Sequence, residues 1–487
     1  MSSLQIAVDG GVVSGRRIGG LRTWRGVPYA APPAGELRFR APHPVTPWQG
    51  VRPAHRFAAR PAQPRGGGSE DCLHLDVVAP VAPSGELRPV MVYIHGGAYE
   101  SGASSNAMYH GTGLVKRGDV VYVSVGYRLG ALGYLDFSQF STPDRTFESN
   151  LGLRDQIAAL EWVQRNIAAF GGDPANVTLF GESAGANAVT TLMTVPRARG
   201  LFTRAIAQSP PAASTYLPER AARWAREFVE IGATDDPATW LAAAPPEELV
   251  AAGSELTARS LTAEPGVRPY APTVDGDLLP SPALEAFEAG RSHPVPFLVG
   301  TNSHEGRVFP RFLDILPTSP ERITHLFSRF DADLFDRVVG AYPGYPHRHA
   351  AADLGGDVTF WEPAIRCARG HAAHSPTYVY RYDYAPALLH AAGLSATHTL
   401  ELYAVFGHHP WWTRVFTAGG ARDALTRVTE VVQGHWLAFA RDGEPENSWP
   451  RYELADPATY VIDRQPRVEI GLDEAKRLAW LGYEHLR

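Results

Sequence analysis

The chain has 487 residues, of which 44% are hydrophobic and 20% charged, proportions typical of a globular protein with a large buried core. No apolar run approaches the roughly 18–20 residues that a membrane-spanning helix requires, so we expect no membrane segment. The net charge of −6 comes from 45 basic and 51 acidic residues, spread along the chain without long single-sign blocks. This argues against a nucleic-acid partner, because phosphate backbones are bound by clustered cations.

The first residues and the cysteines indicate the compartment. Residues 1–10 contain neither the basic segment nor the continuous apolar segment of a secretion signal. Cys72 and Cys367 are the only cysteines, and they could form one disulfide. A large cytosolic chain has enough core without such a bond, so two free thiols are the better interpretation. We therefore expect a cytoplasmic protein.

Strand and helix patterns alternate between about residues 77 and 201. Residues 89–94 and 120–125 are continuous β-rich apolar runs, typical of strands buried on both faces of a parallel sheet. Residues 151–170 carry apolar side chains at steps of three and four, which predicts a helix ended by Gly171. A strand is predicted next, at 177–180. This order predicts an α/β fold with a large, mostly parallel central sheet and helices on both faces.

The later part of the chain adds helical segments between further strands. Residues 211–290 and 309–375 are mostly helical in pattern, and β-rich runs follow at 296–299 and 377–382. We interpret residues 1–487 as one domain, with helical insertions at about 211–290 and 309–375 that form pocket walls. Some aromatic residues are pocket candidates by position only, each at least as well explained as core: Phe309, Phe312, Phe360, Trp361, Trp411 and Trp412.

A glycine-framed serine directly follows the strand predicted at 177–180. Residues 181–185 (Gly-Glu-Ser-Ala-Gly) fit the pattern G-x-S-x-G, in which a sharp strand-to-helix turn lifts the serine hydroxyl clear of the sheet. Because these residue types are common, an ordinary tight turn is the alternative. The preceding strand and the helix-compatible run from Ala186 favour the nucleophile elbow of an α/β-hydrolase fold, with Ser183 as the nucleophile.

A second motif follows the strand predicted at 89–94. Residues 95–98 (His-Gly-Gly-Ala) match a loop that donates backbone N–H groups to the negative oxygen formed during acyl transfer. Glycine lets this backbone approach the substrate without a Cβ in the way. A generic glycine turn is the alternative. Two motifs of one reaction, each after its own strand, favour an oxyanion hole that also includes the N–H of Ala184.

The serine hydroxyl needs a base, usually a histidine oriented by a carboxylate. In this fold the order along the chain is serine, acid, histidine. Glu305 follows the strand predicted at 296–299 and is the candidate acid, although a solvated loop glutamate could occupy the same position. The residues alone leave the base open among the later histidines, which include His325, His347, His349, His371, His374, His390, His398, His408, His409 and His435.

Several segments together resemble the type-B carboxylesterase family, which includes cholinesterases, mammalian carboxylesterases and bacterial para-nitrobenzyl esterases. The resemblance covers nearly the whole chain. Its segments are 24–30 (Trp-Arg-Gly-Val-Pro-Tyr-Ala), 70–73 (Glu-Asp-Cys-Leu), 126–130 (Gly-Tyr-Arg-Leu-Gly), 170–174 (Phe-Gly-Gly-Asp-Pro) and 180–186 around the serine. It implies an α/β-hydrolase fold and ester hydrolysis through an acyl-enzyme.

The resemblance also implies a role for particular residues. Residues 300–306 are similar to the family's acid segment, which gives Glu305 the carboxylate role. Residues 398–407 are similar to its histidine segment, which makes His398 the base and Glu401 a supporting residue. The oxyanion donors would be the N–H groups of Gly97, Ala98 and Ala184. No cofactor and no metal are implied.

We therefore predict a serine carboxylesterase with a broad range of small-molecule ester substrates, acting as a monomer or homodimer. Hydrolysis of carbamates or amides by the same three residues is the nearer alternative, because these motifs do not specify the leaving group. A non-catalytic binding protein is a more distant alternative, since some members of the family have lost residues of the triad.

Overall fold

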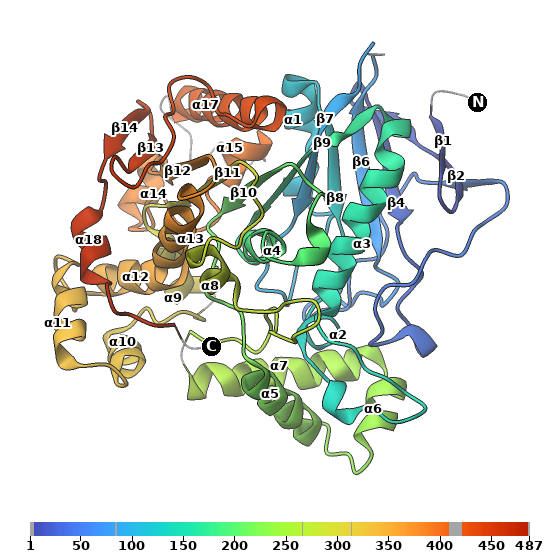
Figure 1. Cartoon of the computed structure of the whole chain (residues 1–487), viewed down its shortest axis with the longest axis horizontal. Coiled ribbons are helices and arrows are strands. Elements are labelled where there is room, and N and C mark those ends of the chain that lie inside the picture. The colour runs from blue at the N-terminus through green and yellow to red at the C-terminus, as the bar shows by residue number, and fades with distance from the viewer. Residues whose placement is uncertain (1–3, 83–84, 265, 313, 409–420, 486–487) are drawn as a thin grey trace. The chain divides into compact units, whose positions relative to one another are not determined.

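The computed structural model describes residues 4–82, 85–264, 266–312, 314–408 and 421–485 (Figure 1). These residues form two compact units that are interleaved along the chain. The first comprises Met1–Ile206, Ser214–Ala258 and Pro269–Pro282, and the second Ala207–Ala213, Arg259–Arg268 and Ala283–Arg487. The interpretation of residues 1–487 as one domain stays a prediction.

A mixed sheet organises the first unit, with the spatial order β9-β7-β8-β6-β4-β3. Its strands are β3 (Arg16–Ile18), β4 (Leu21–Pro28), β6 (His74–Pro80), β7 (Arg88–Ile94), β8 (Val121–Val125) and β9 (Gly172–Glu182). β7 pairs in parallel with both β8 and β9, whereas β6 pairs antiparallel with β8 and β4. A separate small sheet holds β1 (Gln5–Val8), β2 (Gly11–Ser14) and β5 (Val51–Pro53).

The parallel strands of this unit confirm the strands expected at 89–94, 120–125 and 177–180. Residues Val90 to Ile94 of β7 are completely buried, as an apolar strand with covered faces must be. β9 begins at Gly172, five residues earlier than expected, because Gly172 already pairs with Arg88 before a register shift. The apolar pattern of the sequence predicted only residues 177–180, the most apolar part of β9.

Helices of the first unit follow its strands. They are α1 (Thr112–Gly118), α2 (Ala131–Tyr134), α3 (Leu151–Asn166), α4 (Ala184–Leu192), α5 (Pro218–Ile231), α6 (Pro237–Ala243) and the larger part of α7 (Pro246–Ala263), with short 3₁₀ turns η1 (Gly35–Leu37), η2 (Ala107–Tyr109), η3 (Ser138–Phe140), η4 (Ile167–Phe170) and η5 (Pro196–Ala198). The helix expected over 151–170 is α3 plus η4, ended by Gly171 at φ 94°. β10 (Arg204–Gln208) begins in the first unit and ends in the second.

The second unit combines strands in the order β14-β13-β12-β11 with many short helices. β11 (Phe297–Asn302), β12 (Thr377–Tyr382) and β13 (Ala458–Ile462) run parallel, and β14 (Arg467–Ile470) is antiparallel to β13. Its helices are α8 (Ala283–Glu288), η6 (Glu305–Val308), α9 (Phe309–Phe312), α10 (Pro320–Phe327), α11 (Ala332–Gly340), α12 (Arg348–Gly356), η7 (Asp357–Trp361), α13 (Glu362–Ala372), α14 (Ala387–Ala391), α15 (Leu402–Phe406), α17 (Ala421–Asp442) and α18 (Glu474–Ala479). Helices α5 to α8 lie within 211–290 and α9 to α13 within 309–375, and the interpretation of these segments as helical insertions stays a prediction.

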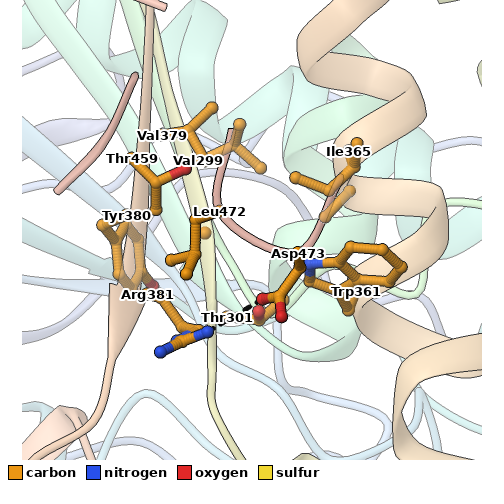
Figure 2. A pocket seen from close by; sticks show the side chains of 12 residues that line it. Val299, Thr301, Trp361, Ile365, Val379, Tyr380, Arg381, Thr459, Leu472 and Asp473 are labelled. Carbon is orange, nitrogen blue, oxygen red and sulfur yellow. Dashed lines mark hydrogen bonds and ion pairs between the residues drawn. The ribbon is translucent and has the colours of Figure 1, made fainter. Parts of the chain in front are cut away.

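A small cavity of about 20 Å³ lies between β11, β12 and α13 in the second unit (Figure 2). Arg381 on β12 reaches across it, with its Nη1 atom 2.8 Å from Asp473. The Nε and Nη2 atoms of the same guanidinium donate to the two carboxylate oxygens of Asp383, at 2.8 Å each. The indole of Trp361 closes another side of the cavity. These charges hold the start of α18 against β12.

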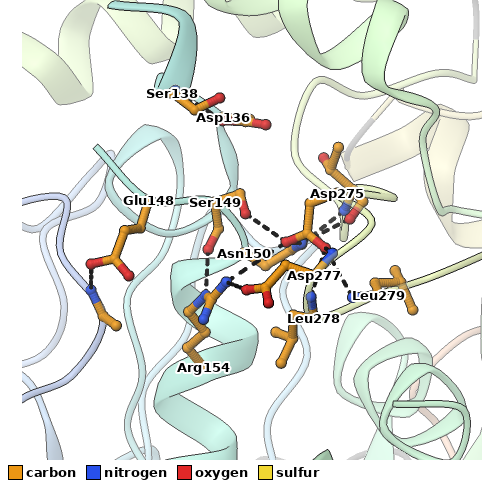
Figure 3. A network of polar contacts seen from close by, with 12 residues as sticks. Asp136, Ser138, Glu148, Ser149, Asn150, Arg154, Asp275, Asp277, Leu278 and Leu279 are labelled. Carbon is orange, nitrogen blue, oxygen red and sulfur yellow. Dashed lines mark hydrogen bonds and ion pairs between the residues drawn. The ribbon is translucent and has the colours of Figure 1, made fainter. Parts of the chain in front are cut away.

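A polar network anchors residues 273–279 to the start of α3 in the first unit (Figure 3). Asp275 accepts hydrogen bonds from Ser149 Oγ at 2.6 Å and Asn150 Nδ2 at 2.7 Å. Its other oxygen accepts the N–H groups of residues 277–279. Burial raises the pKa of Asp275, but the hydrogen bonds from Ser149, Leu279 and Asn150 outweigh it and hold this pKa below its usual value.

Candidate active site

Ser183 occupies a sharp turn between β9 and α4. β9 ends at Glu182, α4 begins at Ala184, and Ser183 between them has φ 56° and ψ −125°. A non-glycine residue in such a conformation stores roughly 1–3 kcal/mol of strain, and such strain concentrates at functional sites. The local geometry is that of the strand-turn-helix elbow that the sequence predicts.

Two glycines make this turn possible. A Cβ on Gly185 would lie 2.0 Å from the carbonyl oxygen of Ile94, and one on Gly181 would lie 2.5 Å from the backbone of Gly185. Backbone atoms cannot give way as a flexible side chain can. The two small residues of the G-x-S-x-G pattern are therefore required by the close approach of β7, β9 and the first turn of α4.

The loop after β7 lies directly beside Ser183. A Cβ on Gly96 would be 3.0 Å from the Cβ of Ser183 and 2.6 Å from the carbonyl oxygen of Glu182. Gly97 and Ala98 both have positive φ, at 117° and 55°. The structure therefore brings the predicted oxyanion loop and the predicted nucleophile together within the first unit. Ala184 is the first residue of α4, next to Ser183.

The buried side chain of His95 packs within this loop. Its ring is fully buried, stacks on Tyr127 with ring centroids 4.5 Å apart, and contacts the carbonyl oxygen of Gly96 through Nδ1 at 2.8 Å. The hydroxyl of Tyr127 donates to the carbonyl oxygen of His95 at 2.6 Å. Burial lowers the pKa of His95 to about 4, so the ring is neutral at physiological pH.

Glu305 and His398 form a buried pair in the second unit. The Nδ1 atom of His398 lies 2.6 Å from Oε2 of Glu305, and these side chains are 7% and 0% exposed. Glu305 is the first residue of η6, three positions beyond the end of β11. Of the histidines that the residues alone left open, His398 has the short contact with the predicted acid. The pairing expected from the family resemblance is present in the geometry.

The second oxygen of Glu305 has partners that the sequence analysis missed. Oε1 accepts the hydroxyl of Ser209 at 2.5 Å and the backbone N–H of Asn302 at 2.7 Å. Both residues follow or end a strand, β10 and β11, and that position is the one signal that could have indicated them. Together these donors fix the carboxylate that contacts His398.

Glu401 lies beside this pair as a second buried carboxylate. It accepts Nδ2 of Asn302 at 2.7 Å and Nε2 of Gln208 at 3.3 Å. Burial and then the charge of Glu305 raise the pKa of Glu401 to about 7. The supporting position expected for Glu401 agrees with these contacts.

The candidate pocket aromatics have different surroundings. Phe309 and Phe360 pack against His398, Trp361 lines the cavity of Figure 2, and Phe312 is 74% exposed. Trp411 and Trp412 lie outside the described residues.

Among the described residues, no group of three or more His, Cys, Asp or Glu side chains is placed to hold a metal ion. None of the helices in the described ranges combines the length and the apolar character that crossing a bilayer requires.

Comparison with known proteins identifies the family. Residues 2–480 match the model of the carboxylesterase family, which is nearly the whole chain. The chain belongs to the carboxylesterase family. It is 34% identical over 491 residues to the para-nitrobenzyl esterase of Bacillus subtilis (strain 168), with 96% of each chain covered. It is 32% identical over 481 residues to carboxylesterase 5A of Homo sapiens, with 88% of this chain and 80% of that protein covered.

Solved structures of carboxylesterases are similar in fold as well. Carboxylesterase EST55 of Geobacillus stearothermophilus at pH 6.2 has a TM-score of 0.86 and 34% identity, covering 98% of this chain and 100% of that chain. A structure of PNB esterase has a TM-score of 0.86 and 33% identity over the same shares. The protein is thus a carboxylic ester hydrolase with the α/β-hydrolase fold, as the sequence predicts.

Proposed function

We propose that this carboxylesterase works through a serine nucleophile and an acyl-enzyme, with Ser183, Glu305 and His398 as its triad. His398 Nε2 takes the proton from Ser183 as Oγ attacks the ester carbonyl, and Glu305 orients the imidazole. The N–H groups of Gly97, Ala98 and Ala184 stabilise the oxyanion. Collapse expels the alcohol with the proton from His398, and water then repeats the sequence on the acyl-enzyme to release the acid.

The strained turn at Ser183 is the observation that carries this proposal. A serine at φ 56° between a strand and a helix, beside a loop whose residues 97 and 98 both have positive φ, is difficult to explain by packing alone. The contact between Glu305 and His398 supports it further. If Nδ1 carries the proton donated to Glu305, then Nε2 is left as the acceptor that a general base requires.

Burst kinetics test the nucleophile. Wild-type protein mixed with a para-nitrophenyl short-chain ester should release nitrophenol in a burst stoichiometric with protein. Ser183→Ala should abolish the burst and lower kcat by roughly 10⁴-fold or more, because the nucleophile and base act as a unit. Ser138→Ala, on the short turn η3, serves as the matched serine control and should retain the burst. Undiminished turnover in Ser183→Ala would overturn the triad.

Leaving-group preference is the second part of the proposal. We expect esters to be hydrolysed faster than matched carbamates and amides, over a broad range of acyl and alcohol groups. Rates on an ester, a carbamate and an amide that share one acyl group decide this. If the amide or carbamate is hydrolysed faster, the protein is an amide or carbamate hydrolase with the same triad, and the proposed broad ester range is wrong.

The proposed setting is a cytoplasmic enzyme that acts as a monomer or homodimer on small-molecule esters. Both cysteines are free and buried, which suits a reducing compartment. Light scattering on the purified protein measures the oligomeric state directly.

A further inference from the structure

Two phenylalanine rings cover the imidazole of His398. Phe360 lies nearly parallel to it, with ring centroids 4.3 Å apart and an interplanar angle of 22°. Phe309 lies 5.3 Å away at 39°, and the two phenylalanine rings are 6.0 Å from each other. Phe360 and Phe309 are 3% and 5% exposed. The base therefore has one edge bound to Glu305 and a face covered by an aromatic ring.

These contacts constrain different movements of the imidazole. The hydrogen bond between Nδ1 and Glu305 restrains one edge of the ring but leaves the plane free to tilt about that edge. A parallel ring at stacking distance opposes this tilt. The direction in which Nε2 points is therefore set by Glu305 and Phe360 together, and misplacing a reacting group by as little as 1 Å can cost about 10²-fold in rate.

A local departure from the α-helix presents Phe360 to His398. α12 and α13 are continuous through η7, a π-helical turn in which the N–H of Glu362 donates to the carbonyl oxygen of Asp357. Pro363 follows directly. Proline has no N–H to donate and its ring clashes with the carbonyl four residues earlier, so a regular α-helical register cannot continue through it. Turns of this kind are frequent at functional sites.

Contacts on the other side of η7 hold the turn in place. Asp357 accepts the hydroxyl of Tyr342 and the ammonium of Lys476, each at 2.9 Å. The same ammonium lies 4.8 Å above the ring of Trp361, which lines the cavity of Figure 2 and also belongs to a buried apolar cluster with Tyr342. Adjacent residues of the turn thus have different neighbours: Trp361 packs against Lys476, and Phe360 packs against His398.

A glycine contact brings the acid and the π-helical turn together. A Cβ on Gly306 would lie 1.7 Å from the carbonyl oxygen of Ala352, and one on Gly356 would lie 2.3 Å from the N atom of Gly306. The turn η6, which begins at Glu305 and leads into Phe309, is therefore in backbone contact with the end of α12, immediately before η7. One compact contact positions the carboxylate, the π-helical turn and both aromatic rings around His398.

The electrostatics of the stack favour the protonated base. The face of a benzene ring carries negative potential and attracts a cation, by an amount that increases when water is excluded. His398 becomes an imidazolium only after it has taken the serine proton, so this attraction is stronger in the transition state than in the ground state. An interaction of that kind raises kcat rather than lowering KM. An aliphatic side chain of similar size would fill the space without supplying it.

We propose that Phe360, presented by the π-helical turn η7, is a positioning residue that holds the plane of His398 and stabilises its imidazolium during acyl transfer. The inference rests on the proposed function, in which His398 is the general base. Phe360 itself transfers no proton and forms no bond.

Substitution of Phe360 by leucine, methionine and tyrosine tests the role. Rates are normalised to the active sites counted by acyl-enzyme burst, and folding is followed by thermal melting. Phe360→Leu and Phe360→Met should each lower kcat about tenfold, equivalent to about 1.4 kcal/mol, with KM changed by less than about twofold. Phe360→Tyr keeps the aromatic face and should restore kcat to within about threefold of wild type. Phe439→Leu, a fully buried ring on α17 of the same unit that packs against Tyr378, is the matched control and should keep kcat.

Two results overturn the role of Phe360. Wild-type kcat per titrated site in Phe360→Leu or Phe360→Met would show that the ring is ordinary core. An equal loss of kcat in the leucine and tyrosine variants would show that the aromatic face of Phe360 contributes nothing to turnover. His398→Gln separates this failure from failure of the proposed function: if His398→Gln retains wild-type turnover, His398 is not the base and both fail. If His398→Gln is inactive while Phe360→Leu is unimpaired, the positioning role alone is wrong.

Discussion

Single buried polar side chains determine much of the local chemistry of this protein. Asp76 on β6 is a clear case, because it is 6% exposed and accepts the backbone N–H of Gly26 at 2.9 Å. Burial raises its pKa to about 6, against the hydrogen bonds from Gly26 and Ser104, which lower it. The folded state therefore holds this proton more tightly than the unfolded chain does.

The sign of the pH dependence follows from that shift. A carboxyl whose pKa is higher in the folded state contributes stability below its unfolded pKa of about 4, and the contribution is lost as the pH rises through about 6. Asp76→Asn removes the titration. Relative to wild type, the free energy of unfolding of the variant should therefore increase between pH 4 and pH 7, by up to about 3 kcal/mol.

Urea unfolding at several pH values measures the difference in unfolding free energy between the variant and wild type. Loss of the hydrogen-bond acceptor changes this difference by the same amount at every pH, so the test is how the difference varies with pH. Parallel curves for the two proteins would contradict the elevated pKa.

At the scale of elements, close backbone contacts position the candidate site. One such contact joins Gly306 of η6 to Gly356 of α12, where a Cβ on Gly356 would also lie 3.1 Å from the Cβ of Glu305. Neither glycine has a positive φ, so the requirement here is space and not backbone conformation. The turn η6 and the helix α12 can meet there because the residue that each contributes to the contact is a glycine, which has no side chain.

Gly356→Ala should therefore reduce both stability and turnover. Forcing a methyl group into such a contact costs about 1–3 kcal/mol of unfolding free energy. It should also lower kcat, because η6 must shift and carries Glu305 with it. Gly340→Ala at the end of α11 is the matched control: a Cβ there meets no heavy atom within 4 Å, and alanine should stabilise the helix by up to about 1 kcal/mol. Urea unfolding and kcat are compared for the two variants, and a Gly356→Ala protein as stable and active as wild type would disprove the contact.

At the scale of the whole molecule, each unit contains one free cysteine and is stabilised by packing. Cys72 lies in the first unit and Cys367 in the second, both buried and free. Burial is the main cause that raises the pKa of each thiol above its usual value. The interpretation of two free thiols is confirmed. A buried thiol with a raised pKa is a poor nucleophile, because the thiolate is the reactive form.

The thiols should accordingly be inert in the native protein. Ellman's reagent should find no rapidly reacting thiol at neutral pH and two in guanidinium chloride, and reducing agent should leave the melting temperature unchanged. Rapid reaction of either cysteine before unfolding would mean that its unit opens locally at low free-energy cost.

The sequence alone determined the elements and the motifs whose information is local. The strands at 89–94 and 120–125, the helix from 151 and the serine turn at 181–185 depend on neighbouring residues, so periodicity and glycine spacing predict them. The choice of His398 among many histidines came from resemblance to the carboxylesterase family, because no local pattern distinguishes a base from a surface or core histidine.

Only the tertiary structure decided which distant residues meet. Ser209 lies 96 positions before Glu305 and was not connected with it from the sequence. His398 lies 93 positions after Glu305 and was connected with it only through the family resemblance. The stack of Phe360 on His398 likewise depends on a helix register altered at one turn and on two glycines 50 positions apart. Such contacts arise from chain packing over long sequence separations, and for that reason sequence patterns of a few residues cannot specify them.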